Sequence, residues 1–149
     1  MDRIFAEFLQ HTSFDRLDKP AQLRGAEQPP LEAEYDSTKP IIELPPPLSS
    51  PLLNDSLRQV MNDRRTLRKY SRDALSMEEL SFLLWCTQGV QETVPAYEGK
   101  GLKTMRTVPS AGARHAFDTY LLINRVEGLP SGLYRYVALG HKLVQLDTT

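Results

Sequence analysis

Apolar residues recur at helical spacing in two stretches of the first half of the chain. The first is a short amphipathic stretch at about Ile4–Gln10. The second follows Asn54 or Asp55, either of which is an expected N-cap, and is predicted to end at about Arg65. Its apolar positions are Leu53, Leu57, Val60 and Met61. Both stretches are predicted to be short helices.

A third helix is better marked, between residues 76 and 89. Ser76 and Glu79 have the spacing of a capping box, and Gly89 stands at the expected C-terminal end. Leu75 and Leu80 occupy the positions of a hydrophobic staple. Apolar residues lie on more than one side of this helix, so it is expected to be largely buried. These residues are Leu80, Phe82, Leu83, Leu84 and Trp85.

The pattern changes in the last third of the chain, where it predicts strands. Residues 90–108 contain two glycines within three positions and are predicted to be a long loop. The continuous apolar run Thr119–Ile123 predicts a strand that is buried on both faces. Residues 134–146 are typical of a β-hairpin that closes at Leu139–His141. Helices that precede a sheet predict an α+β or α/β class, with a central sheet and a C-terminal β-hairpin.

Prolines divide the chain into two parts. Eight of the 11 prolines lie within the first 51 residues, where they disfavour long helices and central strands. Residues 1–50 are therefore predicted to be an extended N-terminal arm, and residues 51–149 a folded domain. The arm is expected to lie along another surface because it carries apolar side chains to bury, namely Phe5, Phe8, Ile41, Ile42 and Leu44.

Composition excludes several classes of protein. The 149 residues are 40% hydrophobic and 25% charged, with no apolar run near the ~18 residues that span a membrane and no signal-peptide core. A single cysteine, Cys86, excludes an internal disulfide, and the three histidines have no metal-site spacing. The net charge of −1 and the pI of about 6.3 disfavour a nucleic-acid-binding protein. We expect a cytoplasmic protein that binds neither metal, membrane nor nucleic acid.

A local cluster of positive charge contrasts with the nearly neutral net charge of the whole chain. Arg64, Arg65, Arg68 and Lys69 lie within six positions. Guanidinium groups suit bidentate binding of phosphate, and the Thr66 hydroxyl adds a neutral donor. A solvated basic turn or a nucleic-acid contact would have the same composition, and residue types alone leave these alternatives open.

A second candidate segment is rich in small residues. Pro109, Ser110, Ala111 and Gly112 would let the backbone approach a flat ligand closely and offer N–H donors to it. The alternative, which the residues alone favour, is that Ser110 caps a helical turn that begins with Ala111–Ala116. The segment lacks the G-x-S-x-G pattern of a nucleophile elbow and the G-K-[ST] of a P-loop.

The two segments occur in an order that resembles the nitroreductase superfamily. The matching stretches are RRTLRKY, the helix LSFLLW that leads to QG, PSAG, and NRVEGLPSGLYRY. The chain is most similar to the SagB-type (azoline dehydrogenase-like) branch, and its proline-rich arm resembles the leader of that branch. The resemblance covers nearly the whole chain.

This resemblance implies a fold, a cofactor and an activity. The fold would be an α+β, nitroreductase-like three-layer sandwich, usually in an intertwined homodimer. The cofactor would be FMN: Arg64, Arg65 and Thr66 would hold its phosphate and ribityl chain, with Arg68 close by. Residues 109–112 would contact the isoalloxazine, generally that of the partner subunit. The expected activity is oxidoreduction by hydride transfer through flavin N5, with NAD(P)H as donor or acceptor and a nitro compound, quinone or peptide azoline as substrate.

The chain departs from the family pattern in two ways. Members commonly continue PSAG with Leu-Tyr-Pro, whereas Ala113, Arg114, His115 and Ala116 stand here, so substrate contacts are expected to differ. The helices and strands that normally follow the hairpin are missing, so we expect an incomplete, N-terminal part of the domain that binds FMN poorly by itself. The alternative is a non-catalytic fragment or interaction module that requires a complementary chain.

Overall fold

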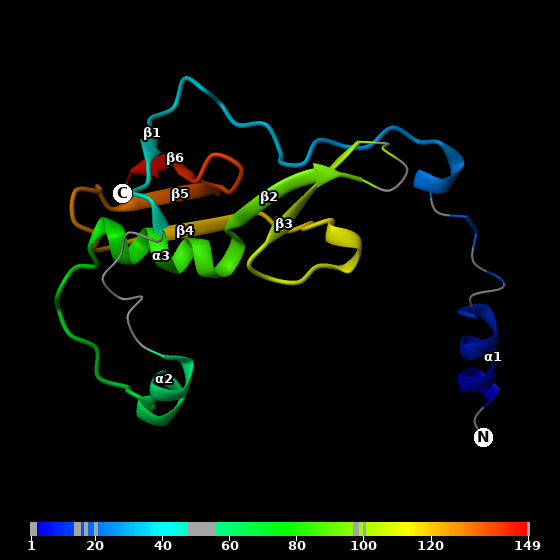
Figure 1. Cartoon of the computed structure of the whole chain (residues 1–149), viewed down its shortest axis with the longest axis horizontal. Coiled ribbons are helices and arrows are strands. Elements are labelled where there is room, and N and C mark those ends of the chain that lie inside the picture. Colours follow the sequence, from blue (N-terminus) through cyan, green and yellow to red (C-terminus); the bar gives the residue numbers. More distant parts are fainter. Residues whose placement is uncertain are drawn as a thin grey trace. The chain divides into compact units, whose positions relative to one another are not determined.

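The computed structural model describes residues 3–13, 16, 18–19, 21–47, 56–96, 99 and 101–148 (Figure 1). The chain divides into two compact units, Met1–Pro30 and Leu31–Thr149. The smaller unit contains helix α1 (Arg3–His11) and a 3₁₀ turn, η2 (Ala21–Arg24). The predicted helix at about Ile4–Gln10 is therefore confirmed. Its apolar side chains are exposed, with Phe5 at 53% and Phe8 at 61%.

The larger unit is built on a four-stranded antiparallel sheet in the order β1-β6-β5-β4. Its strands are β1 (Ile41–Glu43), β4 (Thr119–Ile123), β5 (Gly132–Val137) and β6 (Lys142–Thr148). β5 and β6 form the predicted C-terminal hairpin, which turns through residues 138–141. Helices and a mainly antiparallel sheet confirm the α+β class.

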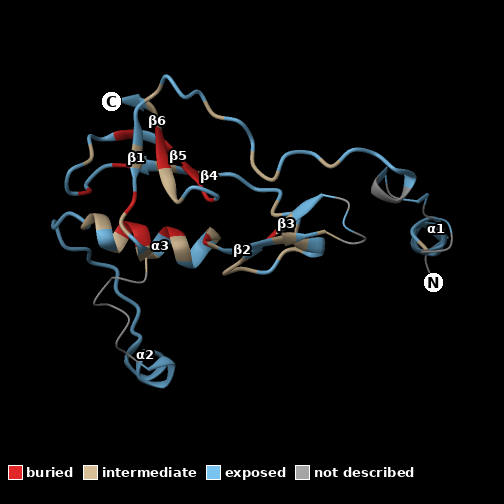
Figure 2. Ribbon diagram, turned by 45° about the horizontal axis from the view of Figure 1, so that its top comes forward, coloured by how far each residue is buried: buried red, intermediate tan, exposed pale blue. Residues whose placement is uncertain are grey.

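One helix covers a face of this sheet. Helix α3 (Met77–Gln88) lies along it and packs into a single apolar core (Figures 1 and 2). Burial of each large apolar side chain contributes about 1.5–3 kcal/mol to folding. The buried members of the core are Leu44, Leu80, Leu84, Ile123, Val126, Tyr134, Tyr136, Ala138 and Leu143.

The start and end of α3 follow from local sequence. The Ser76 side chain accepts a hydrogen bond from the Glu79 amide at 3.1 Å, and the Glu79 carboxylate accepts one from the Ser76 amide at 2.8 Å. The predicted capping box is thus confirmed, as is Gly89 at the C-terminal end. The prediction that this helix is largely buried holds for one side only: Leu80 and Leu84 are buried against the sheet. Leu83, on another side, is 50% exposed.

Two strand predictions are also corrected. Residues 90–108 contain a second sheet, in which β2 (Val90–Pro95) pairs with β3 (Leu102–Arg106), rather than one long loop. The glycines that indicated a loop lie between these two strands. Strand β4 has the predicted bounds but lies at the edge of its sheet, and Leu122 on its outer face is 68% exposed.

Residues 31–47 of the predicted arm form part of the larger unit. β1 pairs with β6, and the buried Arg135 guanidinium donates to the backbone carbonyls of Glu34 at 2.9 Å and Ala33 at 2.8 Å. The Glu32 carboxylate accepts from the amides of Ala138 at 2.6 Å and Leu139 at 3.4 Å. These contacts attach the segment to the β5–β6 hairpin. Residues 31–47 are called the strap below.

A buried polar network also attaches the strap to the core. The Ser81 hydroxyl donates to the Pro45 carbonyl at 2.6 Å and lies 2.8 Å from His141 Nε2. The Tyr136 hydroxyl lies 2.8 Å from His141 Nδ1. Because Ser81 gives its only proton to Pro45, His141 Nε2 must donate to Ser81, and Nδ1 must accept from Tyr136. Every partner is satisfied when the imidazole is neutral.

Candidate functional site

The basic segment follows helix α2 (Leu57–Asp63), whose N-cap is Ser56. Asn54 and Asp55, the expected caps, lie outside the described residues. The helix ends at the C-cap Arg64, and the backbone then continues without regular structure. Arg64, Arg65, Thr66 and Arg68 are all exposed. Arg65 donates to two backbone carbonyls, those of Asn62 at 2.7 Å and Arg64 at 2.9 Å.

No acid neutralises this segment within the described part of the chain. The side chains of Arg64 and Arg68 form no ion pair or hydrogen bond there. Their guanidinium groups are therefore available to an anion, with the strong geometric preference for phosphate or carboxylate that a planar fork provides.

The small-residue segment forms a tight turn. Ala111–Ala113 is one 3₁₀ turn, η6, and the Ser110 hydroxyl accepts a hydrogen bond from the His115 amide at 2.8 Å. Gly112, Ala113 and His115 have φ values of 63°, 54° and 44°. A left-handed conformation costs about 1–2 kcal/mol for a residue with a Cβ. The turn therefore holds backbone strain, with Ala111 and Gly112 exposed at its tip.

The structure leaves the two predicted segments separate. No hydrogen bond or ion pair joins residues 64–68 to residues 109–112 among the residues that the structure describes. Within one copy of the chain, the cationic side chains and the exposed backbone of the turn are thus two separate candidate segments, called the half-sites below.

A groove adjoins the small-residue turn. It has a volume of about 290 Å³ and is lined by β3, the segment that follows it, and His115. The members of the lining are Thr104, Met105, Arg106, Thr107, Val108, Pro109, Ser110, Ala113 and His115. Pro109 and Ser110 were predicted from the sequence, but Arg106 was not. Its only signal was its position three residues before Pro109.

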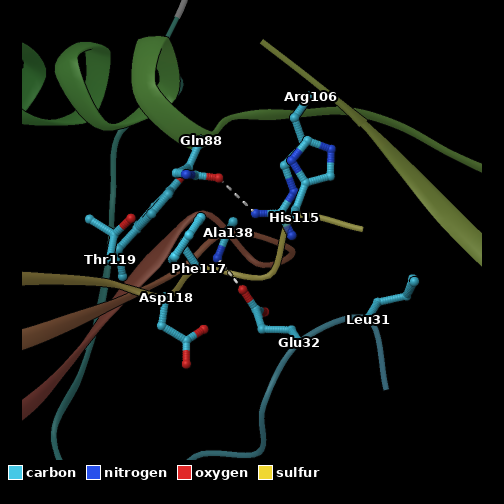
Figure 3. A pocket seen from close by; sticks show the side chains of 10 residues that line it. Leu31, Glu32, Gln88, Arg106, His115, Phe117, Asp118, Thr119 and Ala138 are labelled. Carbon is cyan, nitrogen blue, oxygen red and sulfur yellow. Dashed lines mark hydrogen bonds between the residues drawn. The ribbon is translucent and has the colours of Figure 1, made fainter. Parts of the chain in front are cut away.

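Arg106 is held in place from two sides. Its Nε donates to Thr104 Oγ1 at 3.1 Å. Its Nη1 donates to Gln88 Oε1 at 3.1 Å, the bond drawn in Figure 3. Burial, and then the positive charge of Arg106, lower the pKa of the His115 imidazole, while a hydrogen bond to the Thr104 backbone raises it. The groove therefore has one fixed cation beside a histidine that favours its neutral form.

A small cavity lies on the other side of this pair. It measures about 20 Å³, comparable to the space for one water molecule, and Glu32, Gln88, Arg106, His115 and Asp118 are among its lining residues (Figure 3). Its two carboxylates bind elsewhere: Glu32 binds the amides of the β5–β6 turn, and Asp118 lies 3.6 Å from Arg135. Neither forms an ion pair with Arg106.

Two features are absent from the described residues. No group of three or more His, Cys, Asp or Glu side chains among them is arranged to hold a metal ion. None of their helices has the length and apolar character needed to cross a membrane.

Comparisons with known proteins agree with this architecture. No family model matches the chain. Over 90 residues, the chain is 33% identical to a protein of Methanocaldococcus jannaschii named "Putative nitroreductase". The match covers 60% of this chain and 41% of that protein, so the chain spans about two fifths of the length of the relative.

A solved structure has a similar fold. It is the crystal structure of a "putative nitroreductase" from Anabaena variabilis, with a TM-score of 0.54 and 19% identity. The match covers 100% of this chain and 26% of that one. The chain is therefore similar in sequence to one protein that is named a "putative nitroreductase", and its α+β fold is similar to that of another.

Proposed function

We propose that the chain provides part of an FMN-dependent oxidoreductase of the nitroreductase type, of the SagB-type (azoline dehydrogenase-like) branch. The observation that carries this proposal is the 33% identity over 90 residues to a nitroreductase, together with the similarity of fold. NAD(P)H would serve as electron donor or acceptor. The substrate would be a nitro compound, a quinone or a peptide azoline.

The described residues fit the two ends of FMN. Arg64 and Arg68 carry exposed guanidinium groups without an acidic partner, as binding of a phosphate requires. Arg65 and Thr66 stand beside them and would complete the contacts to phosphate and ribityl chain. At the turn, Ala111 and Gly112 expose backbone, and a Cβ added to Gly112 would meet only the Arg114 side chain, at 3.8 Å. A flat ring could therefore approach this backbone closely.

The separation of the half-sites supports a homodimer. Because no hydrogen bond or ion pair among the described residues joins the basic segment to the turn within one copy, a complete site is proposed to combine residues 64–68 of one copy with residues 109–112 of a second. The flavin, when bound, would supply hydride transfer at N5. The residues of the chain would bind and orient it, and none of them is assigned a role as nucleophile.

The alternative is a non-catalytic interaction module that pairs with a complementary chain. Exposed apolar side chains favour it, in particular Tyr120 at 56% and Leu122 at 68% on the outer face of β4. An absorption spectrum of the purified chain after addition of FMN and desalting, with its mass in solution, separates the two proposals. Retained flavin on a dimer supports the enzyme, whereas a colourless chain that binds neither FMN nor a second copy favours the module.

A single substitution tests the phosphate contact. Arg64→Ala is expected to weaken FMN binding by about 1.5–3 kcal/mol, the range for a hydrogen bond to a charged group. Quenching of flavin fluorescence during titration measures the affinity. Arg58→Ala, which removes an exposed charge from α2, is the matched control and should leave the affinity unchanged. Equal affinities of the Arg64 variant and the parent would contradict the assignment.

A further inference from the structure

The groove beside the small-residue turn has an uneven distribution of charge. Its lining contains the Arg106 guanidinium and the His115 imidazole but no carboxylate. The walls are otherwise made of small, apolar or hydroxyl-bearing residues, among them Val108 and Pro109. Any charge preference of the groove is therefore set by Arg106.

The guanidinium of Arg106 has no ion-pair partner among the described residues. Its two described hydrogen bonds go to neutral oxygens, those of Thr104 and Gln88. These bonds use two of the five N–H donors of a guanidinium, so donors remain for a ligand. The nearby carboxylates of Glu32 and Asp118 bind other groups.

Anchoring makes this arrangement suited to recognition. A guanidinium that is already fixed loses little conformational freedom when a ligand binds, and the partly enclosed groove screens its charge less than bulk water does. An aromatic ring could lie against Val108 and Pro109 while an anionic group reaches Arg106. A volume of about 290 Å³ would hold a single-ring compound.

We infer that this groove binds a small planar organic acid, with its carboxylate on Arg106 and its ring against Val108 and Pro109. Pro109 also belongs to the segment proposed to contact the flavin, so the ligand would lie next to the ring. The role of this organic acid as the electron acceptor rests on the proposed function, whereas the binding of the acid to the groove does not. Arg106 is then the residue that selects anionic over neutral substrates.

Binding of 4-nitrobenzoate and of its uncharged methyl ester to the full chain tests this inference. NMR titration of the His115 ring, assigned with the His115→Asn variant, reports on the groove without requiring flavin. We expect 4-nitrobenzoate to bind at least about tenfold more tightly than the ester, a factor at the lower limit for a hydrogen bond to a charged group. The bound carboxylate should also raise the pKa of His115, because it offsets the charge of Arg106.

Variants of Arg106 test whether this residue causes the preference for 4-nitrobenzoate over its methyl ester. Arg106→Gln should abolish it, Arg106→Lys should keep most of it, and Arg58→Gln, which removes a distant charge, should leave it unchanged. Circular dichroism establishes that each variant is folded. Equal affinity for acid and ester, or a preference that survives in the folded Arg106→Gln variant, would overturn the inference.

A parallel FMN titration separates this inference from the proposed function. Flavin binding without any anion preference overturns the groove assignment alone. Anion preference without flavin binding supports the groove assignment and favours the interaction module over the flavoenzyme.

Discussion

The network around His141 makes the stability of the larger unit depend on pH. The imidazole accepts a hydrogen bond from Tyr136 and donates one to Ser81, which is compatible only with its neutral form. Burial lowers the pKa of His141, and a hydrogen bond to the Pro45 backbone partly offsets this effect. Protonation would place a proton on Nδ1, facing the Tyr136 hydroxyl, whose own pKa is raised to about 12, chiefly by burial.

The sign of the effect follows from linkage. A histidine with a lowered pKa in the folded state binds fewer protons there than in the unfolded state, so stability rises with pH in the window between the two pKa values. The stabilisation is complete above the unfolded value of about 6.5 and is lost as the pH falls through the lower, folded value. One proton contributes at most about 1.4 kcal/mol per pH unit. The pKa of Asp36 is also lowered, but that carboxyl titrates below this window.

His141→Asn removes the imidazole without adding backbone strain. The φ angle is 47° at this position, and asparagine tolerates left-handed conformations. Tyr136 is 2% exposed, so its hydroxyl would lose a partner in the interior. An unsatisfied buried group costs about 1–3 kcal/mol, and the lost bond to Ser81 adds about 0.5–1.5 kcal/mol. We therefore expect the variant to lose about 2–4 kcal/mol at pH 7.5.

Urea unfolding between pH 5 and 8, followed by fluorescence of the single tryptophan, Trp85, measures the free energy of unfolding and its dependence on pH. The parent should lose stability toward pH 5, and His141→Asn should lose less of it over the same range. His115 also has a lowered pKa and adds a slope of the same sign, which the control His115→Asn measures separately. An unchanged slope in His141→Asn would refute the coupling between this histidine and the fold.

Two further substitutions test how the strap and the sheet are held. Glu32→Gln should destabilise the larger unit by about 1.5 kcal/mol, because the carboxylate binds two amides of the β5–β6 turn. Glu34→Gln is the matched control, and equal unfolding midpoints of the two variants would contradict the role of Glu32. Gly132→Ala should cost about 2–3 kcal/mol or more in chemical unfolding, since the added Cβ would lie 2.2 Å from the Asp147 carbonyl oxygen, whereas Gly128→Ala, with open space around it, should cost less.

Local sequence determined the elements whose signals lie within a few residues. The capping box of Ser76 and Glu79, the bounds of β4 and the β5–β6 hairpin could be predicted because each depends on side-chain spacing and turn residues close together in the chain. The basic segment and the small-residue turn were found for the same reason. Their roles in binding FMN stay predictions.

Tertiary structure decided which faces are covered and which distant residues meet. Leu83 and Leu122 are exposed because the described fold places a neighbour on only one side of α3 and β4, a property that apolar pattern alone does not contain. Arg106 could be identified as a candidate only from the folded structure, in which the pairing of β2 with β3 places Arg106 next to Gln88 and His115. The sequence by itself determined the bounds of α3 and β4 and the position of the β5–β6 hairpin, because these depend on local bonds. Contacts between residues far apart in the chain, such as those of Arg135 and Ser81 with the strap and of His141 with Ser81, required the folded structure.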